Sequence, residues 1–455
     1  MTLLSHARKD AEWIAHTLRL RGHRAYFAGG CVRDIILKRE PADYDVATDA
    51  TPDQVMRIFP AAIPVGAQFG VVLVAPAHDQ QHADPPSSAS RGRVEVATFR
   101  CDLSYSDGRH PDQVRFSSSP QEDAQRRDFT INGLLLDPAS GEVLDFVGGR
   151  NDIQAGIIRA IGDPEQRFAE DKLRLLRAVR FAARFQFLIE AATFGAMQKH
   201  APRVRDVSHE RTRDELTKML TEGHARQAFL LLDSSGLLKE VLPEISAMKG
   251  VDQPPHYHPE GDVFEHTLLL LEQLSLGCSP TLAWGALLHD VGKPSTFRVA
   301  PDRIRFDGHV EVGVKMAENI CRRLRFSNDD TQQILALVQN HMRFGDVLRM
   351  KDSTLKKFLR LPAFEEHMAL HRMDCLSSHR DLTCYHYAQE KLHSIPPETM
   401  RPVPLVTGDD LIRAGYKPGP QFKHILAAIE DAQLEGLLPS GEDAMDLVRR
   451  QFPLP

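Results

Sequence analysis

The spacing of apolar residues changes character near Glu165. Before this point, apolar runs of strand length are separated by turn residues, as in AYFAGG, FGVVLVA, RVEVATF and GLLLD. After it, nearly every segment repeats its apolar residues with helical period, as in EDKLRLLRAVRFAARF and DDTQQILALVQNHM. The pattern predicts an α+β fold, in which a head of mixed β-sheet and helices is followed by an all-helical remainder.

The length of the chain indicates how this remainder is divided. A chain of 455 residues is too long for one hydrophobic core and suggests about three domains. A change of composition near Gly250, followed by the pair Pro254–Pro255, marks a boundary within the helical part. We therefore expect a head over residues 1–150, a helical neck and body over 151–250, and a further helical domain with a tail over 251–455. The polar stretch from residue 77 to 93 is predicted to be a loop extension without an assigned role.

Charge and cysteine content narrow the class of protein. The formal charge of −6 does not mark a nucleic-acid binder, although local basic patches can bind phosphates. One stretch, Arg343 to Arg360, carries six Lys or Arg against two Asp, and either follows RNA phosphates or forms a solvated helix face. The six cysteines lack CxxC spacing, which indicates reduced thiols in a cytoplasmic protein. No apolar run is long enough to span a bilayer, so we expect no membrane partner.

Two aspartates one residue apart, Asp43 and Asp45, are the first candidates for catalysis. Side chains at this spacing on a strand project from the same face, so the two carboxylates would repel each other. A divalent cation relieves such repulsion, and Mg²⁺ prefers hard oxygen ligands and substrate phosphates. A bare Asp-x-Asp is also common as a polar strand edge, so the neighbouring residues decide between the two interpretations.

Those neighbours favour a phosphate site. At Gly29 and Gly30 no Cβ stands in the way, so backbone amides could approach phosphate oxygens. Arg33, expected at the start of a helix, could add a guanidinium fork for a triphosphate. Glu95, in the middle of a predicted strand, is the best candidate for the third acid of a two-metal phosphoryl-transfer site. Alone, Glu95 is equally well explained as part of a solvated strand face.

Six motifs in order carry a family resemblance: GGCVRD, DYDVATDATP, VEVATFR, RRDFTINGLLLD, EDKLRLLRAVRF and ERTRDEL. Together, from Ala28 to Leu220, they resemble the class II tRNA nucleotidyltransferase and bacterial poly(A) polymerase family, a branch of the DNA polymerase beta superfamily. The resemblance implies a nucleotidyltransferase head, with Asp43 and Asp45 binding catalytic Mg²⁺ and Glu95 as third acid. It also implies nucleotide contacts from residues of three motifs: Gly29, Gly30, Arg33, Arg127, Asp128, Asn132, Arg177 and Arg180.

The pair Asp171 and Arg174 offers a way to choose a nucleotide. Residues three apart on a helix are neighbours, so a carboxylate acceptor and a guanidinium donor would lie side by side. Cytosine and adenine both present an amino donor beside a ring-nitrogen acceptor, whereas uracil and guanine present the reverse. The pair would therefore accept C or A and reject U or G. In the family it resembles, this EDxxR motif selects CTP and ATP; a solvated i,i+3 ion pair is the alternative.

Two further segments of the same region were interpreted through the resemblance. HERTRDEL, residues 209 to 216, is similar to a family helix that braces the neck, and we expect a structural role. The segment from Asp102 to Gln125 is similar to a flexible lever with which members that add CCA switch from C to A, which argues against an enzyme that adds only CC.

The second half of the chain contains a different constellation. His266, His289-Asp290 and Asp374 resemble the H…HD…D signature of the HD phosphohydrolase superfamily, and His309 and His341 could extend it to a two-metal set. Lys293 follows one turn after the doublet. Imidazole and carboxylate ligands from separate helices can converge in a bundle and hold a divalent transition metal that activates water. The alternative is a set of inherited core and surface histidines in a scaffold that holds RNA.

Together these motifs predict template-independent addition of CCA to the 3′ end of tRNA from CTP and ATP, with Mg²⁺ as cofactor. Three rivals remain. A poly(A) polymerase and an enzyme that adds only A share the head, and a metal-dependent HD phosphohydrolase could use the head merely to bind RNA. No protein partner can be deduced from the sequence.

Overall fold

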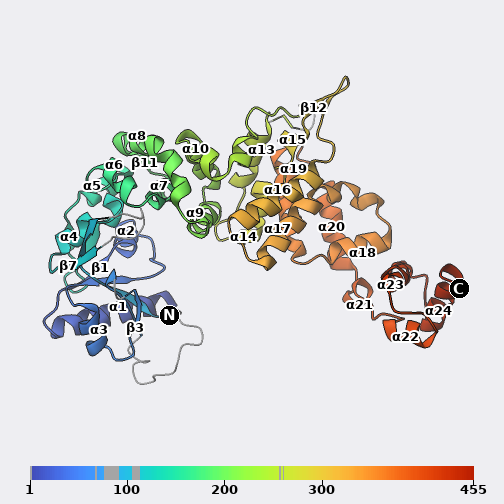
Figure 1. The fold of residues 1–455 in the computed structure, drawn as a ribbon, viewed down its shortest axis with the longest axis horizontal. Coiled ribbons are helices and arrows are strands. Elements are labelled where there is room, and N and C mark those ends of the chain that lie inside the picture. Colours follow the sequence, from blue (N-terminus) through green and yellow to red (C-terminus); the bar gives the residue numbers. More distant parts are fainter. Residues whose placement is uncertain are drawn as a thin grey trace. The chain divides into compact units, whose positions relative to one another are not determined.

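The computed structural model describes residues 3–66, 69–75, 92–104, 113–255, 258–259 and 261–454. The chain forms two compact units, Met1–Pro243 and Glu244–Pro455, which are described separately (Figure 1). The stretch from residue 77 to 93 lies almost wholly outside the described residues, as do residues 105–112 of the segment from Asp102 to Gln125. The three-domain assignment made from the sequence stays a prediction.

A seven-stranded mixed sheet forms the centre of the head. Its strands are ordered β3-β4-β5-β2-β1-β8-β9, and only β2 and β5 run parallel. Apolar side chains on the central strands, such as Phe27, Val46 and Val96, are buried, which is why short runs such as RVEVATF form strands. The strands are β1 (Ala25–Ala28), β2 (Asp45–Thr48), β3 (Ile63–Gly66), β4 (Val71–Val74), β5 (Val94–Thr98), β8 (Leu134–Leu136) and β9 (Val143–Asp145).

Short helices and one hairpin complete the head. Helix α1 packs against β1 and β2, and α2 begins directly after β1. Strands β6 and β7 form an antiparallel pair beside the sheet. The bounds are α1 (Leu3–Leu20), α2 (Gly30–Ile36), α3 (Pro52–Ile58), α4 (Pro120–Gln125), β6 (Arg100–Ser104) and β7 (Gln113–Phe116). The expected α+β head is confirmed.

Helix α7 (Leu173–Phe185) is the central element of the rest of the first unit. It packs against α9 and α10, and it buries charged residues such as Arg174 and Arg180 as well as its apolar face. Around it lie α5 (Gly149–Ala155), α6 (Pro164–Glu170), α8 (Ala191–His200), α9 (His209–Thr221), α10 (Ala225–Ser234) and α11 (Leu238–Val241). A parallel pair of two-residue strands, β10 (Ile157–Ile158) and β11 (Leu188–Ile189), lies in this otherwise helical part.

The second unit is a helical bundle with a separate C-terminal cluster. The bundle comprises α13 (Val263–Glu272), α14 (Pro280–Leu288), α15 (Lys293–Thr296), α16 (His309–Arg323), α17 (Asn328–Asn340), α18 (Asp352–Leu359), α19 (Phe364–Ser377) and α20 (Thr383–Ser394). Helices α22 (Gly408–Arg413), α23 (Pro420–Leu434) and α24 (Gly441–Gln451) enclose a small core of their own. Among the described residues, no helix combines the length and apolarity that crossing a bilayer requires.

Three cations of the basic stretch Arg343 to Arg360 face helix α23. The ammonium of Lys356 donates to the Leu434 carbonyl at 2.5 Å, and that of Lys357 pairs with Asp431 at 2.7 Å. Arg360 pairs with Glu430. Half of the six cations are therefore occupied in holding α18 against α23, which favours a structural role for this part of the stretch.

Gly292 allows the turn before α15 to contact the start of α16. A Cβ at this position would lie 2.1 Å from the His309 carbonyl oxygen and 2.7 Å from the Gly313 nitrogen. Both neighbours are backbone atoms, so no side chain can move aside.

We predict that Gly292→Ala lowers the free energy of unfolding of the second unit by about 3 kcal/mol, because the two segments must separate. Chemical denaturation followed by circular dichroism measures this. Gly195→Ala is the matched control: Gly195 lies inside α8 with open space at its Cβ, and alanine there is expected to be neutral or stabilising by up to about 1 kcal/mol. Equal stabilities of the two variants would contradict the prediction.

Candidate functional site

A cavity of about 500 Å³ opens where the head meets α7 and α9. Eight arginines and four aspartates line it, so its wall is strongly polar with an excess of positive charge. The predicted residues that the structure brings to this cavity are Gly29, Gly30, Arg33, Asp43, Asp45, Arg127, Asp128, Asn132, Asp171, Arg174, Arg177 and Arg180. Glu95 is the one predicted head residue that does not line it.

Three carboxylates lie close together where the central strands β2 and β5 begin. The parallel register that pairs Val46 with Val96 places Asp45 next to Glu95 on adjacent strands. Strand β2 begins only at Asp45, so the expectation that Asp43 shares this strand is wrong; Asp43 lies in the irregular stretch before it. Burial, Glu95 and Asp43 raise the pKa of Asp45 to about 7, and loss of hydration and Asp43 raise the pKa of Glu95.

This cluster has the chemistry of a divalent-cation site. Its donors are all carboxylate oxygens, which suit a hard ion such as Mg²⁺. The raised pKa values show that the negative charges destabilise one another, and a cation between them would remove that cost.

The backbone of Gly29 is in close contact with the side chain of Arg127. It has φ of +72°, and a Cβ there would lie 2.7 Å from Nη1 of Arg127, so both conformation and space favour glycine. Asp123 on α4 holds the Arg127 guanidinium with Nη2–Oδ2 at 3.0 Å. Asp123 was not among the residues predicted from the sequence, although a carboxylate four residues before an arginine indicates an ion pair on a helix.

Asp128 joins the head to α7. Its Oδ2 accepts from Nε of Arg177 at 2.8 Å, and its Oδ1 accepts from Asn132 at 3.0 Å. Asn132 in turn accepts from Nη1 of Arg33 at 2.6 Å. Burial opposes ionisation of Asp128, but the Arg177 guanidinium and the Asn132 amide outweigh it and lower the pKa to about 2. A continuous chain of charge-assisted hydrogen bonds therefore crosses from α2 to α7.

Other arginines of α7 are also held in place by side chains of the protein. Nε of Arg180 donates to buried Glu215 of α9 at 2.6 Å, so Arg180 is an ion-pair partner as well as a residue of the cavity wall. Phe181 lies among the guanidiniums of Arg33, Arg177 and Arg180 at 4.3 to 5.3 Å from ring to carbon, which limits their movement. Glu215 was not identified from the sequence.

Asp171 and Arg174 both reach the cavity, but not from one helix face as expected. Asp171 ends α6 with φ of −137°, and α7 begins only at Leu173, so the helical i,i+3 geometry is wrong for this pair. Arg174 Nη1 donates to Glu170 at 2.7 Å, while Asp171 accepts from Arg211 at 3.0 Å. Asp171 and Arg174 are therefore held by different partners.

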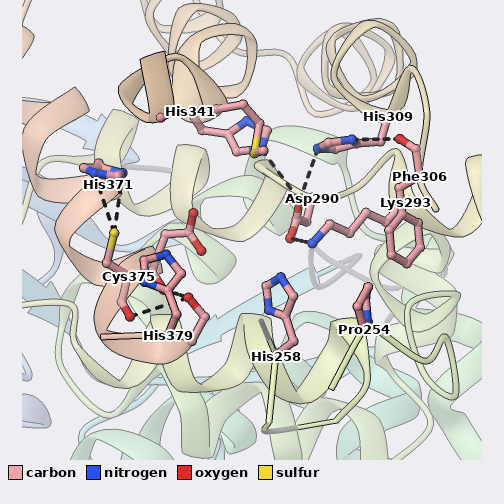
Figure 2. Close-up of a pocket in the computed structure, with 14 residues that line it drawn as sticks. Pro254, His258, Asp290, Lys293, Phe306, His309, His341, His371, Cys375 and His379 are labelled. Atoms are coloured by element: carbon pink, nitrogen blue, oxygen red, sulfur yellow. Dashed lines mark hydrogen bonds and ion pairs between the residues drawn. The ribbon is translucent and has the colours of Figure 1, made fainter. Parts of the chain in front are cut away.

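The second constellation lies in the other unit, beside a cavity of about 380 Å³. Two groups of three potential ligands meet there: His266, His289 and Asp374, and Asp290, His309 and His341. Figure 2 shows His309, His341 and Lys293 arranged around Asp290. All six predicted residues are therefore brought together.

Asp290 lies between the two groups. Its Oδ2 is 3.2 Å from Nε2 of His289, and its Oδ1 is 3.8 and 3.7 Å from Nε2 of His309 and His341. Lys293 pairs with the same Oδ2 at 2.7 Å. His289 and Lys293 hold the pKa of Asp290 well below its usual range despite burial, so it is a carboxylate.

Three imidazoles are oriented by backbone carbonyls. Nδ1 of His289, His309 and His341 lies 2.8, 3.0 and 2.7 Å from the carbonyl oxygen three residues earlier. A carbonyl can only accept, so Nδ1 carries a proton in all three, and the lone pair of the neutral imidazole is on Nε2, the nitrogen that faces Asp290. Burial lowers the pKa of His341 to about 4, so it is neutral at pH 7. This donor set fits a divalent metal.

Models of known protein families match both the head and the helical part of the chain. Residues 25–159 match the model of the poly A polymerase head domain, residues 186–249 that of the probable RNA and SrmB-binding site of polymerase A, and residues 263–376 that of the HD domain. The head fold and its acid-lined cavity thus define a nucleotidyltransferase.

The relatives identify the branch. A CCA-adding enzyme of Levilactobacillus brevis is 32% identical over 95% of this chain and 95% of its own length, and one of Bacillus pumilus is 37% identical over 61% of this chain and 62% of its own. The structure of the Bacillus stearothermophilus CCA-adding enzyme in complex with CTP matches with a TM-score of 0.73, at 26% identity and 99% coverage of both chains. The chain belongs to the family of CCA-adding enzymes.

The crowded acids lead to a stability prediction. The pKa of Asp45 rises from 3.8 to about 7 on folding, so the stability it contributes when protonated is complete below pH 3.8 and is lost as the pH rises through about 7. In EDTA at pH 8, Asp45→Asn should therefore be about 1–2 kcal/mol more stable than the native protein, and the gap should narrow toward pH 4.

Thermal unfolding across this pH range measures the difference. Asp53→Asn, at an exposed acid on α3, is the control and should change stability little at any pH. A constant gap between Asp45→Asn and the native protein would contradict the assignment of the cost to Asp45 ionisation.

Proposed function

We propose that this protein adds C, C and A to the 3′ end of tRNA from CTP and ATP and releases pyrophosphate. One observation carries the proposal: Asp43 and Asp45 of the acid cluster, the arginine wall and the pair Asp171 and Arg174 face a single cavity. The family relationship supports the same activity, since the relatives it matches are CCA-adding enzymes. Such a reaction belongs to the cytoplasm, where CTP, ATP and tRNA meet.

In this proposal Asp43, Asp45 and Glu95 are the catalytic acids. They would hold two Mg²⁺ ions, which when bound supply charge neutralisation for the attacking 3′ hydroxyl and the leaving pyrophosphate. The residues of the chain provide the geometry: the parallel strands β2 and β5 fix Asp45 and Glu95 side by side, so the two carboxylates are positioned before a cation binds.

The arginines of the cavity would hold the triphosphate and ribose. The Arg127 guanidinium lies against Gly29 and that of Arg33 near Gly30, and both line the cavity, so the two guanidiniums can face the same phosphates. Asp128, Asn132, Arg177 and Arg180 form the bonded wall behind them, which keeps the arginines in place before the nucleotide arrives. Preorganised donors cost no rearrangement at the moment of reaction.

Selection of C and A would rest on Asp171 as acceptor and Arg174 as donor. U and G present an acceptor to the carboxylate and a donor to the guanidinium, which leaves all four groups without partners. In the domain assignment proposed here, residues 1–150 perform the chemistry, 151–250 select the nucleotide and bind RNA, and 251–455 bind RNA with the HD-type bundle and tail.

Addition to tRNA lacking its last three nucleotides tests the function. Each nucleoside triphosphate is supplied singly and in combination, and products are resolved by length. Addition of three nucleotides followed by a stop supports CCA addition. A long A tail would identify a poly(A) polymerase, and a single A on tRNA ending in CC, without C addition, would identify an A-adding enzyme.

We predict that Arg174→Ala lowers selectivity for CTP over UTP by about a hundredfold, because the donor that rejects the uracil ring N–H is gone. Single-nucleotide addition kinetics with each triphosphate measure the ratio of kcat/KM values. Arg203→Ala, at an exposed arginine of the same unit, is the control and should keep the native ratio. Native selectivity in Arg174→Ala would refute the donor role.

A second candidate function rests on the arrangement around Asp290. We propose that His266, His289, Asp290, His309, His341 and Asp374 bind one or two divalent transition metals, with Asp290 between them. Metals held there would supply an activated water for hydrolysis of phosphoesters. Backbone carbonyls fix the tautomer of His289, His309 and His341. The ammonium of Lys293 lines the same cavity and would bind a phosphate oxygen there.

We predict that His289→Ala loses at least half of the Mn²⁺ or Ni²⁺ bound by the native protein, because Nε2 of His289 is one of three donors in its group. Metal analysis after dialysis measures this, and hydrolysis of bis-p-nitrophenyl phosphate should fall in parallel while nucleotide addition continues. His424→Ala, at an exposed histidine of α23, is the control. Unchanged metal content would overturn the proposed centre.

A further inference from the structure

Asp171 lies outside regular secondary structure at the point where nucleotide selection would take place. It follows directly after α6 as its C-cap, with φ of −137° and ψ of 109°, and α7 starts two residues later. A side chain at such a junction is not oriented by helix geometry. What holds its carboxylate therefore decides which way the acceptor points.

Arg211 of α9 holds that carboxylate by both oxygens. Its Nη2 donates to Oδ2 of Asp171 at 3.0 Å, and its Nη1 donates to Oδ1 at 3.4 Å. The backbone N–H of Leu173 donates to the same Oδ1 at 3.0 Å. Two guanidinium arms facing two carboxylate oxygens fix the plane of the carboxylate as well as its position. Both side chains line the cavity.

Arg174 is supported by a different set of groups. Its Nη1 donates to Glu170 at 2.7 Å and to the Arg167 carbonyl at 3.0 Å, and its Nη2 donates to the Arg126 carbonyl at 3.2 Å. The donor and the acceptor of the selecting pair can therefore be disturbed separately, which makes the contribution of Arg211 measurable.

We propose that Arg211 is a positioning residue that sets nucleotide specificity, and this rests on the proposed function. It turns the Asp171 carboxylate so that Oδ2, which can accept more than one hydrogen bond, meets the amino group of cytosine or adenine. Rejection of uracil and guanine depends on an acceptor that cannot turn away from their oxygen. Without Arg211 the carboxylate can rotate, the repulsion is relieved, and discrimination falls while the donor side is unchanged.

A purely structural brace between α9 and α7 predicts something else. These helices are already joined by the buried pair of Arg180 and Glu215 and by the packed faces of both helices. If Arg211 only added to this, its loss would lower stability and leave the ratio between nucleotides unchanged. Lysine separates the two ideas, because an ammonium keeps the charge but is a point donor that cannot span both oxygens.

The test compares native protein, Arg211→Ala and Arg211→Lys on tRNA lacking its last three nucleotides, with kcat and KM determined separately for CTP and UTP. We expect the CTP/UTP ratio of kcat/KM to fall about tenfold or more in Arg211→Ala and by less in Arg211→Lys. Arg213→Ala is the matched control: it lies on the same helix with the same 26% side-chain exposure, pairs with the adjacent Asp214 and does not line the cavity. It should keep the native ratio.

A native ratio in both Arg211 variants overturns the proposal, whatever happens to their melting temperature. If Arg211→Ala does not fold, Arg211→Lys decides alone: a lowered ratio supports the proposal and a native one overturns it. Native protein that adds neither C nor A defeats the proposed function itself, which is a result distinct from active protein whose selectivity does not depend on Arg211.

Discussion

The bond between Asp128 and Arg177 is the interaction on which the nucleotide cavity depends. Asp128 belongs to the loop that follows α4 in the head, and Arg177 belongs to the helix that forms the opposite wall. Because Asp128 also accepts from Asn132, which accepts from Arg33, a single carboxylate fixes residues of three elements. The low pKa of about 2 keeps it charged at any physiological pH. The cavity therefore keeps its shape without a nucleotide.

The two candidate sites handle charge in opposite ways. The nucleotide cavity gathers arginines and balances them with acids behind the wall, as suits a ligand with several negative charges. No arginine lines the described part of the cavity beside Asp290; imidazoles and one paired lysine surround a buried carboxylate instead. Such a centre can attract phosphate only through the cations it binds. The same chain would thus recognise negative charge directly in one unit and through metals in the other.

The sequence was sufficient for the fold and for most of the residues that meet in each cavity. Period-2 and helical patterns are local, and motif residues such as Asp45 and His289 carry their chemistry in their side chains. The residues that hold these side chains in place were harder to predict, because Arg211 lies 40 residues from Asp171 and Glu215 lies 35 residues from Arg180. The helical spacing assumed for Asp171 and Arg174 failed because a helix break between them is invisible in an i,i+3 count. The histidine tautomers are set by backbone carbonyls, which every residue has, so the sequence does not indicate them.

Helices α18 and α23 are joined by charged side chains, and the hydrophobic clusters on the two sides are separate. Attraction between exposed charges is screened over about 8 Å at physiological ionic strength, whereas apolar packing is strengthened by salt. The C-terminal helices thus rest on the bundle through the kind of contact that ionic strength weakens, while each cluster keeps its own core. We therefore expect the docking of the C-terminal helices to weaken with rising ionic strength while their own fold is retained.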